Sequence, residues 1–330
     1  MGFIIDQWGV LHNGVKIHDG VHECLGELKR RHKCVILISN TTSLADENAA
    51  YLKSLGLEDG LYDHIVTSGE LIAQGLNKQK DGPLKGIGKK CYVFGRKKAA
   101  TLLESTDIRV VEDIEDAEFI LIAGADEAIV DIERYTYDLK EAVRHGLKAL
   151  CINPDSRSLL GASYLMGPGL IARRYQDFGG IVHYIGKPHS PIFQHCIQIF
   201  QENEVYPSQA VMVGDTMAHD IMGAHYVNLD TCLVKSGMHA GIFKNAVTPM
   251  DVNRTLDVLV THYNHIRPGY LVDKFEWGKA LPDRKHKVHK KHVRRQKPEG
   301  ESEAESDKKP RKIVKKRLTP RKPKKKDEAK

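Results

Sequence analysis

Apolar residues follow two patterns along the chain, short continuous runs and helical spacing. Residues 3–6 and 33–40 are apolar runs that end in polar residues. Such runs are typical of buried parallel strands whose carboxyl ends are exposed. Residues 20–32 and 43–57 carry apolar side chains at the spacing of a helix face. This alternation of strand and helix predicts an α/β fold with a parallel, Rossmann-like sheet.

A second set of elements interrupts this pattern before it resumes. The predicted elements of the set are strands at 89–95, 117–124 and 147–153 and a helix at 135–146. The first pattern then returns with a helix at 191–203 and strands at 210–215 and 231–237. This order predicts a core domain that carries an inserted α/β cap. We expect a core made of residues 1–61 and 178–282, a cap at 62–177 and a separate tail at 283–330.

Polar groups follow three of the predicted core strands. They are Asp6, the run Ser39-Asn40-Thr41, and Asp215. Ligands of open α/β sheets bind outside the carboxyl ends of the strands, so these groups form a candidate site. Two carboxylates that meet there repel unless a cation lies between them, and oxygen ligands suit Mg²⁺. The alternative for any single one of these aspartates is a helix cap or a turn.

Two further residues strengthen this interpretation. Asp220 follows Asp215 by five residues in "GDTMAHD", near the start of a predicted helix. It is placed to bind a metal-bound water or to hold a neighbouring group. Lys187 lies in "IGKPHSPIF", between a predicted strand and a helix that begins with proline. Its ammonium could neutralise both a carboxylate and a phosphate, although such a lysine taken alone is typical of a protein surface.

Composition separates the body of the chain from its end. The net charge of +7 combines +13 after residue 282 with −6 before it. The basic end lacks apolar periodicity and aromatic residues, which predicts a disordered tail that does not stack on bases. It either is a solvated extension or contacts nucleic acid or an anionic surface. Six scattered cysteines and the absence of a long apolar run or a signal sequence predict a cytoplasmic protein without a membrane span.

The motifs, taken together, resemble those of the haloacid dehalogenase (HAD) superfamily. They are "DQWGV", "ISNTT", "GKPHSPIF" and "GDTMAHDI". An insertion between the second and third motifs resembles class IIA of that superfamily, which includes the NagD-like and para-nitrophenyl phosphatase groups. The likeness extends into the insertion, at "FILIAGADEAI", "ALCINPD" and "GPGLIARRYQDFGGIVHYIGKP", and covers about residues 3–277. It implies a Rossmann-like core with a class IIA cap and a phosphatase that acts on small phosphorylated metabolites.

The resemblance also implies a role for each matching residue. Asp6 would attack the phosphorus and form an aspartyl-phosphate. Ser39 and the backbone N–H groups of Asn40 and Thr41 would bind the phosphoryl oxygens, and Lys187 would stabilise the charge. The Mg²⁺ ligands would be Asp6, the backbone carbonyl of Trp8 and Asp215, with Asp220 in support.

Trp8 departs from the pattern, since phosphatases of this superfamily carry an acid two residues after the nucleophile. Indole cannot protonate a leaving group, a contribution that is worth ~10²–10⁴-fold in rate. Three interpretations stay open: another acid serves, the leaving group needs none, or the protein binds phospholigands and turns over little. His12 and His18 are the nearest candidate acids, on the arms of a hairpin that Asn13-Gly14 predicts with a type I′ turn. The alternative for His12 is a structural role, in which the side chain packs beneath this hairpin.

The cap is expected to select the substrate. Asp126, Asn153 and Asp155 match the family by position, although "NPD" is also an ordinary turn signature. A cap of this size favours small phosphorylated substrates. The sequence leaves open the oligomeric state. Only Met1 and Gly2 precede the first strand, which leaves a longer native N-terminus as an alternative.

Overall fold

A computed structural model describes residues 1–80, 82–125, 131–160 and 163–278. The described residues lie in one compact unit, Met1–Lys279. The predicted tail at 283–330 and the candidate residue Asp126 lie outside the described residues. Within the described part, no helix combines the length and the apolar character that crossing a membrane requires.

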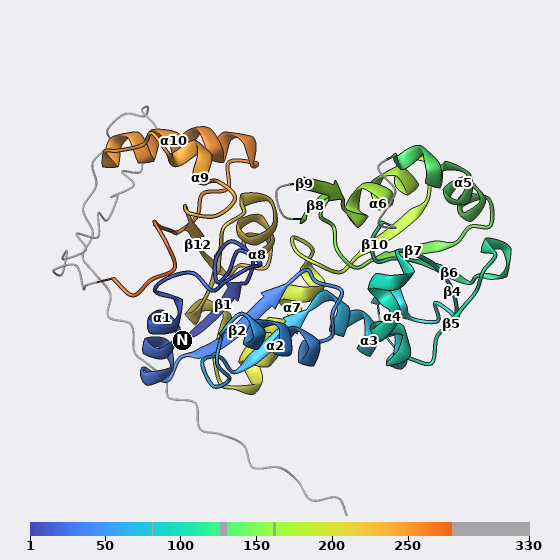
Figure 1. Ribbon diagram of the computed structural model, residues 1–330, viewed down its shortest axis with the longest axis horizontal. Helices are drawn as coiled ribbons and strands as arrows, with labels where there is room; N and C mark the ends of the chain where they lie inside the picture. The colour runs from blue at the N-terminus through green and yellow to red at the C-terminus, as the bar shows by residue number, and fades with distance from the viewer. Residues whose placement is uncertain (81, 126–130, 161–162, 279–330) are drawn as a thin grey trace, which may run out of the picture. The chain divides into compact units, whose positions relative to one another are not determined.

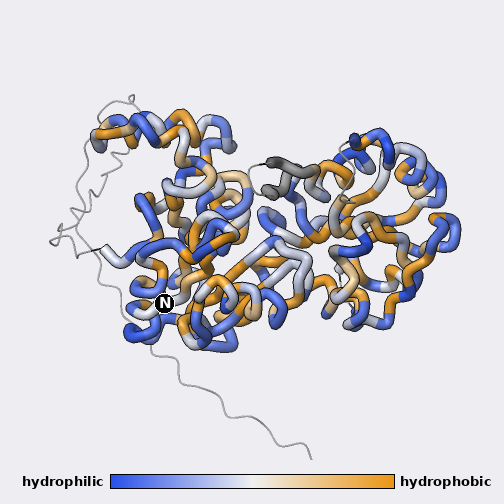
Figure 2. Tube along the Cα trace, viewed as in Figure 1, coloured by the Kyte–Doolittle hydropathy of each residue, from blue (hydrophilic) through white to orange (hydrophobic). Residues whose placement is uncertain are grey.

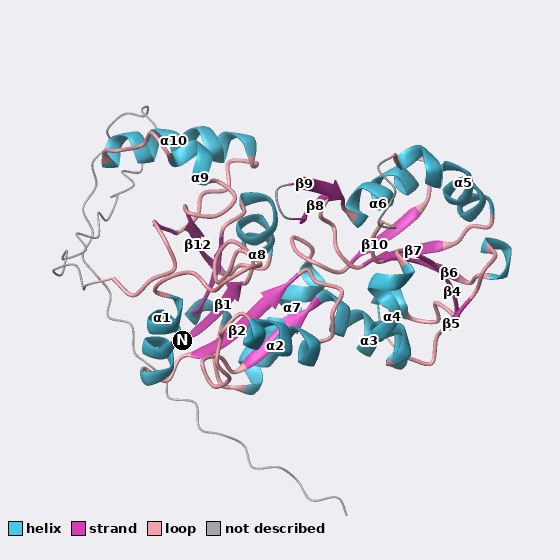
Figure 3. Ribbon diagram, in the orientation of Figure 1, coloured by secondary structure: helices cyan, strands magenta, loops and turns pink. Residues whose placement is uncertain are grey.

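Six parallel strands form the first sheet, called here the core sheet (Figures 1 and 3). Their order is β13-β12-β11-β1-β2-β3. The strands are β1 (Gly2–Asp6), β2 (Cys34–Ser39), β3 (His64–Thr67), β11 (Ala210–Gly214), β12 (Asp230–Val234) and β13 (Tyr270–Val272). β1 ends at Asp6, β2 ends at Ser39 and β11 ends just before Asp215; the three strands are neighbours, so their carboxyl ends meet at one edge.

Helices cover both faces of the core sheet. They are α1 (Val21–Arg30), α2 (Ala45–Ser54), α7 (Ser190–Glu202), α8 (Met222–Tyr226), α9 (Ala240–Phe243) and α10 (Pro249–His262). Alternation along β1 divides the core, because successive strand residues point to opposite faces. Ile5 packs with Leu25 of α1 in one apolar cluster, and Ile4 packs with Phe193 of α7 in another. Figure 2 shows the apolar segments along these strands.

Five parallel strands form the second sheet, called here the inserted sheet, in the order β10-β7-β6-β4-β5. Its strands are β4 (Lys90–Phe94), β5 (Arg109–Val110), β6 (Phe119–Ile122), β7 (Lys148–Cys151) and β10 (Ile181–Tyr184). Its helices are α3 (Ser68–Lys78), α4 (Arg96–Glu104), α5 (Thr136–Arg144) and α6 (Pro168–Asp177). A separate antiparallel pair is formed by β8 (Arg157–Leu160) and β9 (Ser163–Met166).

The predicted parallel α/β fold is therefore confirmed, and the predicted domain boundaries stay predictions. β3 pairs with β2 in the core sheet, although the insertion was expected to begin at residue 62. β10 pairs with β7 in the inserted sheet, although the core was expected to resume at 178. The type I′ turn at Asn13-Gly14 is wrong. Of these two residues only Gly14 has positive φ, and the Asn13 side chain instead accepts the backbone N–H groups of Val15 and Lys16.

Candidate active site

Asp6 and Lys187 meet at the carboxyl edge of the core sheet. Asp6 is the last residue of β1, and Lys187 lies between β10 and α7. The Nζ of Lys187 lies 2.5 Å from Oδ1 of Asp6. Asp6 is 7% exposed and Lys187 is 4% exposed. Burial would favour the neutral amine, but Asp220 and Asp6 outweigh it and raise the pKa of Lys187. The lysine is therefore a fixed cation beside Asp6.

Asp220 is the second partner of this lysine. Lys187 Nζ donates to Oδ1 of Asp220 at 2.7 Å, and the backbone N–H and hydroxyl of Thr216 donate to Oδ2 at 3.0 and 2.7 Å. Asp220 lies in a π-helical turn, Met217–Ile221, and such turns are frequent at functional sites. Burial would raise the pKa of Asp220, but Lys187 and these hydrogen bonds outweigh it and lower the pKa.

Asp215 completes a cluster of three buried carboxylates. It follows β11, and the backbone N–H of Met238 donates to its Oδ2 at 2.7 Å. Oxygen atoms of Asp6, Asp215 and Asp220 all lie within 4.8 Å of one another. Burial and then the charge of Asp220 raise the pKa of Asp215 to about 7. Burial is also the main cause that raises the pKa of Asp6. An oxygen-only cluster with one lysine for three acids fits a divalent cation such as Mg²⁺.

The loop after Asp6 approaches this cluster closely. Gly9 has a φ of +82°, and a Cβ atom placed there would lie 2.1 Å from Oδ2 of Asp215. Glycine is therefore required at this position by both its backbone conformation and the space. The close approach brings the backbone of the Trp8–Gly9 segment beside the carboxylates.

Asn40 fixes the backbone of Lys187. Its Oδ1 accepts the Lys187 N–H at 2.7 Å, and its Nδ2 donates to the Lys187 carbonyl at 3.0 Å. Both atoms of the amide are thus used, and Asn40 is 8% exposed. The sequence reasoning gave Asn40 only a backbone role. The side chain is a positioning group, and its location directly after a buried strand was the available signal.

Ser39, Thr41, Asp6 and Asp215 line a cavity of about 600 Å³. Its lining residues are Asp6, Trp8, Ser39, Asn40, Thr41, Asn153, Asp155, Ser156, Lys187, Asp215, Thr216, His219 and Met238. The Thr41 N–H donates to Oγ of Ser39 at 3.3 Å, and this hydrogen bond holds the Ser39 hydroxyl at the carboxyl end of β2. The cavity lies in the volume range of about 300–1,000 Å³ that small-molecule sites occupy.

Asn153 and Asp155, which follow β7, line the same cavity. The Asp155 N–H donates to Oδ1 of Asn153 at 2.8 Å, which is the turn that "NPD" suggests. Oδ1 of Asp155 also lies 3.4 Å from Nδ2 of Asn40 and 3.4 Å from Nδ1 of His219. His219 was not singled out from the sequence, although it lies within the "GDTMAHD" motif.

His12 lies beside a second cavity and not in the first. It is 2% exposed, and its Nδ1 accepts the backbone N–H of Gly14 at 3.1 Å. Burial lowers the pKa of His12 to about 4, with a smaller contribution from His18. A histidine with this pKa is neutral at neutral pH, and these contacts favour the packed alternative over a general acid. His18 lines neither cavity.

Comparisons with known proteins agree with this arrangement. Residues 3–109 match the family of haloacid dehalogenase-like hydrolases, and residues 184–257 match a HAD-hydrolase-like family. An acid sugar phosphatase of Staphylococcus saprophyticus is 25% identical over 262 residues, which cover 78% of this chain and 96% of the relative.

Two solved structures share the fold. A p-nitrophenyl phosphatase from Archaeoglobus fulgidus superposes with a TM-score of 0.65 at 23% identity, over 83% of this chain and 96% of that one. A glycerol phosphate phosphatase from Mycobacterium tuberculosis, in complex with magnesium, gives a TM-score of 0.59 at 21% identity, over 83% and 74% of the two chains. The two family matches contain the carboxylates, the lysine and the strand ends described above, and the chain belongs to the haloacid dehalogenase superfamily of hydrolases.

Proposed function

We propose that this protein hydrolyses small phosphomonoesters with Mg²⁺, through an aspartyl-phosphate on Asp6. The observation that carries the proposal is the pairing of Asp6 with Lys187 beside a cluster of buried carboxylates at the open edge of the sheet. The acid sugar phosphatase that is similar over most of its length supports a phosphate ester as substrate.

The metal site is proposed from the chemistry of the donors. Asp6, Asp215 and the backbone carbonyl of Trp8 would hold Mg²⁺, and Asp220 would support it. A related fold that was solved with magnesium supports this choice. When bound, the ion supplies charge stabilisation for the transferring phosphoryl group and aligns it with Asp6.

The phosphoryl group would lie between Asp6 and the end of β2. The Ser39 hydroxyl and the backbone N–H groups of Asn40 and Thr41 would donate to its oxygens. Lys187 would stabilise the charge that develops on the phosphoryl oxygens and on Asp6. One Asp6 oxygen forms a bond to phosphorus while the bond from phosphorus to the ester oxygen breaks. Water then cleaves the acyl phosphate and restores the Asp6 carboxylate.

Residues of the insertion would determine which substrate binds. Asn153 and Asp155 line the cavity, and we propose that they contact the leaving group. Asp126, which the resemblance also implies, remains a proposal. From the strand pairing we propose that the cap runs from the end of β3 to the end of β10, about residues 68–184. A cap of this kind favours small substrates.

The leaving oxygen must gain a proton without help from residue 8. His12 is neutral and faces the second cavity, so we propose that it positions the loop and does not act as the acid. The leaving group is then either one that departs as a stable anion or one that takes its proton from water. Both alternatives predict faster hydrolysis of esters with acidic leaving groups.

Trp8 also favours a second candidate function. A site with the binding groups of a phosphatase but without the acid could serve as a phospholigand sensor with little turnover. The basic segment 283–330 would then be the part that contacts nucleic acid or an anionic surface.

Trapping of the intermediate distinguishes the two functions. The protein is mixed with Mg²⁺ and a reactive phosphomonoester, quenched in acid and digested, and the peptide that contains Asp6 is examined by mass spectrometry. A phosphate on Asp6 supports the phosphatase, and Asp6→Asn is the control that must remain unmodified. A peptide that stays unmodified while the ester binds supports the sensor.

A further inference from the structure

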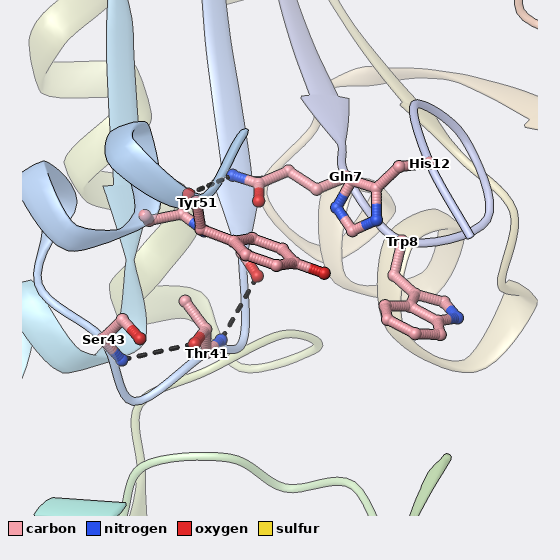
Figure 4. A pocket seen from close by; sticks show the side chains of 8 residues that line it. Gln7, Trp8, His12, Thr41, Ser43 and Tyr51 are labelled. Atoms are coloured by element: carbon pink, nitrogen blue, oxygen red, sulfur yellow. Dashed lines mark hydrogen bonds between the residues drawn. The ribbon is translucent and has the colours of Figure 1, made fainter. Parts of the chain in front are cut away.

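A second cavity adjoins the one that contains Asp6. It has a volume of about 330 Å³ and is lined by Gln7, Trp8, His12, Ser39, Thr41, Ser43, Asn48 and Tyr51 (Figure 4). Trp8, Ser39 and Thr41 line both cavities. The two cavities are therefore neighbours, and the second is called here the side pocket.

Two aromatic rings border the side pocket and remain partly open to solvent. Trp8 is 43% exposed and Tyr51 is 39% exposed, although both are large apolar side chains. They come from different elements, the loop after β1 and helix α2. Figure 4 shows the Tyr51 ring extending from its helix toward the loop that carries Trp8 and His12. Exposed aromatic rings that share one pocket are typical of a surface that binds a ligand.

The two rings are held in place. The His12 ring meets Trp8 edge-to-face at 5.5 Å between centroids and Tyr51 edge-to-face at 5.7 Å. The Tyr51 hydroxyl donates to the Gly14 carbonyl at 3.3 Å. Gly14 has a φ of +83°, and a Cβ atom there would lie 2.3 Å from the Trp8 ring. The neutral, buried His12 thus has a structural purpose, since its ring contacts both aromatic rings.

The rest of the lining is polar and uncharged. The Gln7 side chain donates to Oδ1 of Asn48 at 2.7 Å, and this buried pair closes one side. Thr41 and Ser43 supply hydroxyl groups on another side (Figure 4). No aspartate, glutamate, lysine or arginine is among the lining residues. Aromatic walls with neutral hydrogen-bonding groups suit a flat, uncharged ring and not a second phosphate.

We infer that the side pocket binds a flat unsaturated ring in the leaving group of the substrate, with Trp8 and Tyr51 as its contact surfaces. This inference rests on the proposed function and names the substrate class for that site. It also assigns a purpose to the indole at residue 8, which contributes a binding surface at the position where an acid is missing. The substrate is a phosphomonoester in which a short linker joins the ring to the phosphate.

A matched pair of esters tests ring flatness, and the Tyr51 variants and the phosphonates below separate ring binding from the somewhat greater acidity of the benzylic alcohol. Benzyl phosphate and cyclohexylmethyl phosphate have primary alcohol leaving groups of similar reach and differ in whether the ring is flat. We expect kcat/KM to favour the benzyl ester by about two- to tenfold, the range that one aromatic contact provides. Equal values for the two esters would overturn the inference, while Mg²⁺-dependent hydrolysis of both would leave the phosphatase intact.

Variants at Tyr51 test whether this ring causes the preference for the benzyl ester, because Tyr51 is not one of the catalytic groups. Tyr51→Leu should remove most of the preference, and Tyr51→Phe, which keeps the ring, should retain it. Tyr137→Leu is the matched control, since Tyr137 is 74% exposed on α5. A preference that survives Tyr51→Leu unchanged in a folded protein contradicts the inference.

Binding measurements distinguish a failure of this inference from a failure of the proposed function. Benzylphosphonate and cyclohexylmethylphosphonate cannot be hydrolysed, and calorimetry with Mg²⁺ compares their affinities directly. If no ester is turned over and the benzyl compound still binds more tightly, the phosphatase proposal fails and the ring pocket stands. If the two phosphonates bind equally, the ring pocket fails whatever the turnover.

Discussion

Replacement of Lys187 by methionine should unfold the metal-free protein at markedly lower denaturant. The side chain of Lys187 is buried, and its Nζ contacts Asp6 at 2.5 Å and Asp220 at 2.7 Å. Methionine has a similar length and is accommodated without a large cavity. The variant therefore removes the ammonium and leaves Asp6, Asp220 and Asp215 as buried carboxylates without their common cation.

The magnitude follows from the environment of the pair. Removal of one partner of a buried ion pair costs about 3–5 kcal/mol, because the remaining charge is left buried and uncompensated. With a urea m-value of about 3 kcal/mol/M, the midpoint should fall by about 1 M or more. A lower pH should restore part of the loss, since protonated carboxyl groups no longer repel one another.

The assay is urea unfolding followed by circular dichroism at neutral pH with EDTA. Lys53→Met is the matched control, because Lys53 pairs with Asp59 at the surface, where both side chains are more than half exposed. Its midpoint should equal that of the wild type. A Lys187→Met variant that unfolds at the wild-type midpoint would refute the reasoning, because the carboxylates would then not depend on this cation.

Three further predictions concern the groups around the site and the basic tail. Asn40→Ala should lower kcat by about tenfold or more with the fold retained, because two hydrogen bonds to the Lys187 backbone are lost; a kcat equal to wild type contradicts the positioning role. The contribution of His12 to the free energy of unfolding, measured as the difference between wild type and His12→Gln, should fall by about 2–3 kcal/mol from pH 6.5 to pH 4, because the buried His12, with a pKa of about 4, gains a proton less readily than in the unfolded chain. The raised pKa values of Asp6 and Asp215 act in the opposite direction in both proteins, and a difference that does not change with pH would show that His12 makes no such contribution. Deletion of residues 280–330 should leave hydrolysis unchanged, and loss of hydrolysis would place the tail in the enzymatic function. The second candidate function predicts that the full chain binds RNA or anionic vesicles in a salt-sensitive way and that the deletion abolishes this binding, measured by anisotropy and by sedimentation; equal binding by both proteins contradicts that role of the tail.

The fold was predictable from the sequence where apolar runs were long and ended sharply. The predicted strands at 3–6, 33–40 and 210–215 overlap β1, β2 and β11, so the edge that carries Asp6 and Asp215 followed directly. β3 was not recognised, because it has four residues and is only partly buried. A strand was predicted before Lys187, but its pairing as β10 with β7 of the inserted sheet was not. Sheet membership depends on pairing across the sequence, which periodicity cannot report.

The site itself was only partly predictable. The carboxylates and Lys187 carry their chemistry in their residue types, and they meet as the sheet topology suggests. The side-chain bonds of Asn40 and the burial of His12 depend on packing. His12 was read as a candidate acid from proximity in the sequence, whereas its surroundings lower its pKa and hold it against two aromatic rings. The side pocket combines the loop after β1 with α2, and no single stretch of sequence reveals it.

The central claim is that Asp6 and Mg²⁺ together hydrolyse a phosphate ester at this edge of the sheet. The most direct measurement is phosphate release from a panel of small phosphomonoesters, for wild type and Asp6→Asn, each with Mg²⁺ and with EDTA. The account predicts release only from the wild type with Mg²⁺. Phosphate release that persists in Asp6→Asn or in EDTA would contradict it. So would a wild type that releases no more phosphate than the variant from every ester.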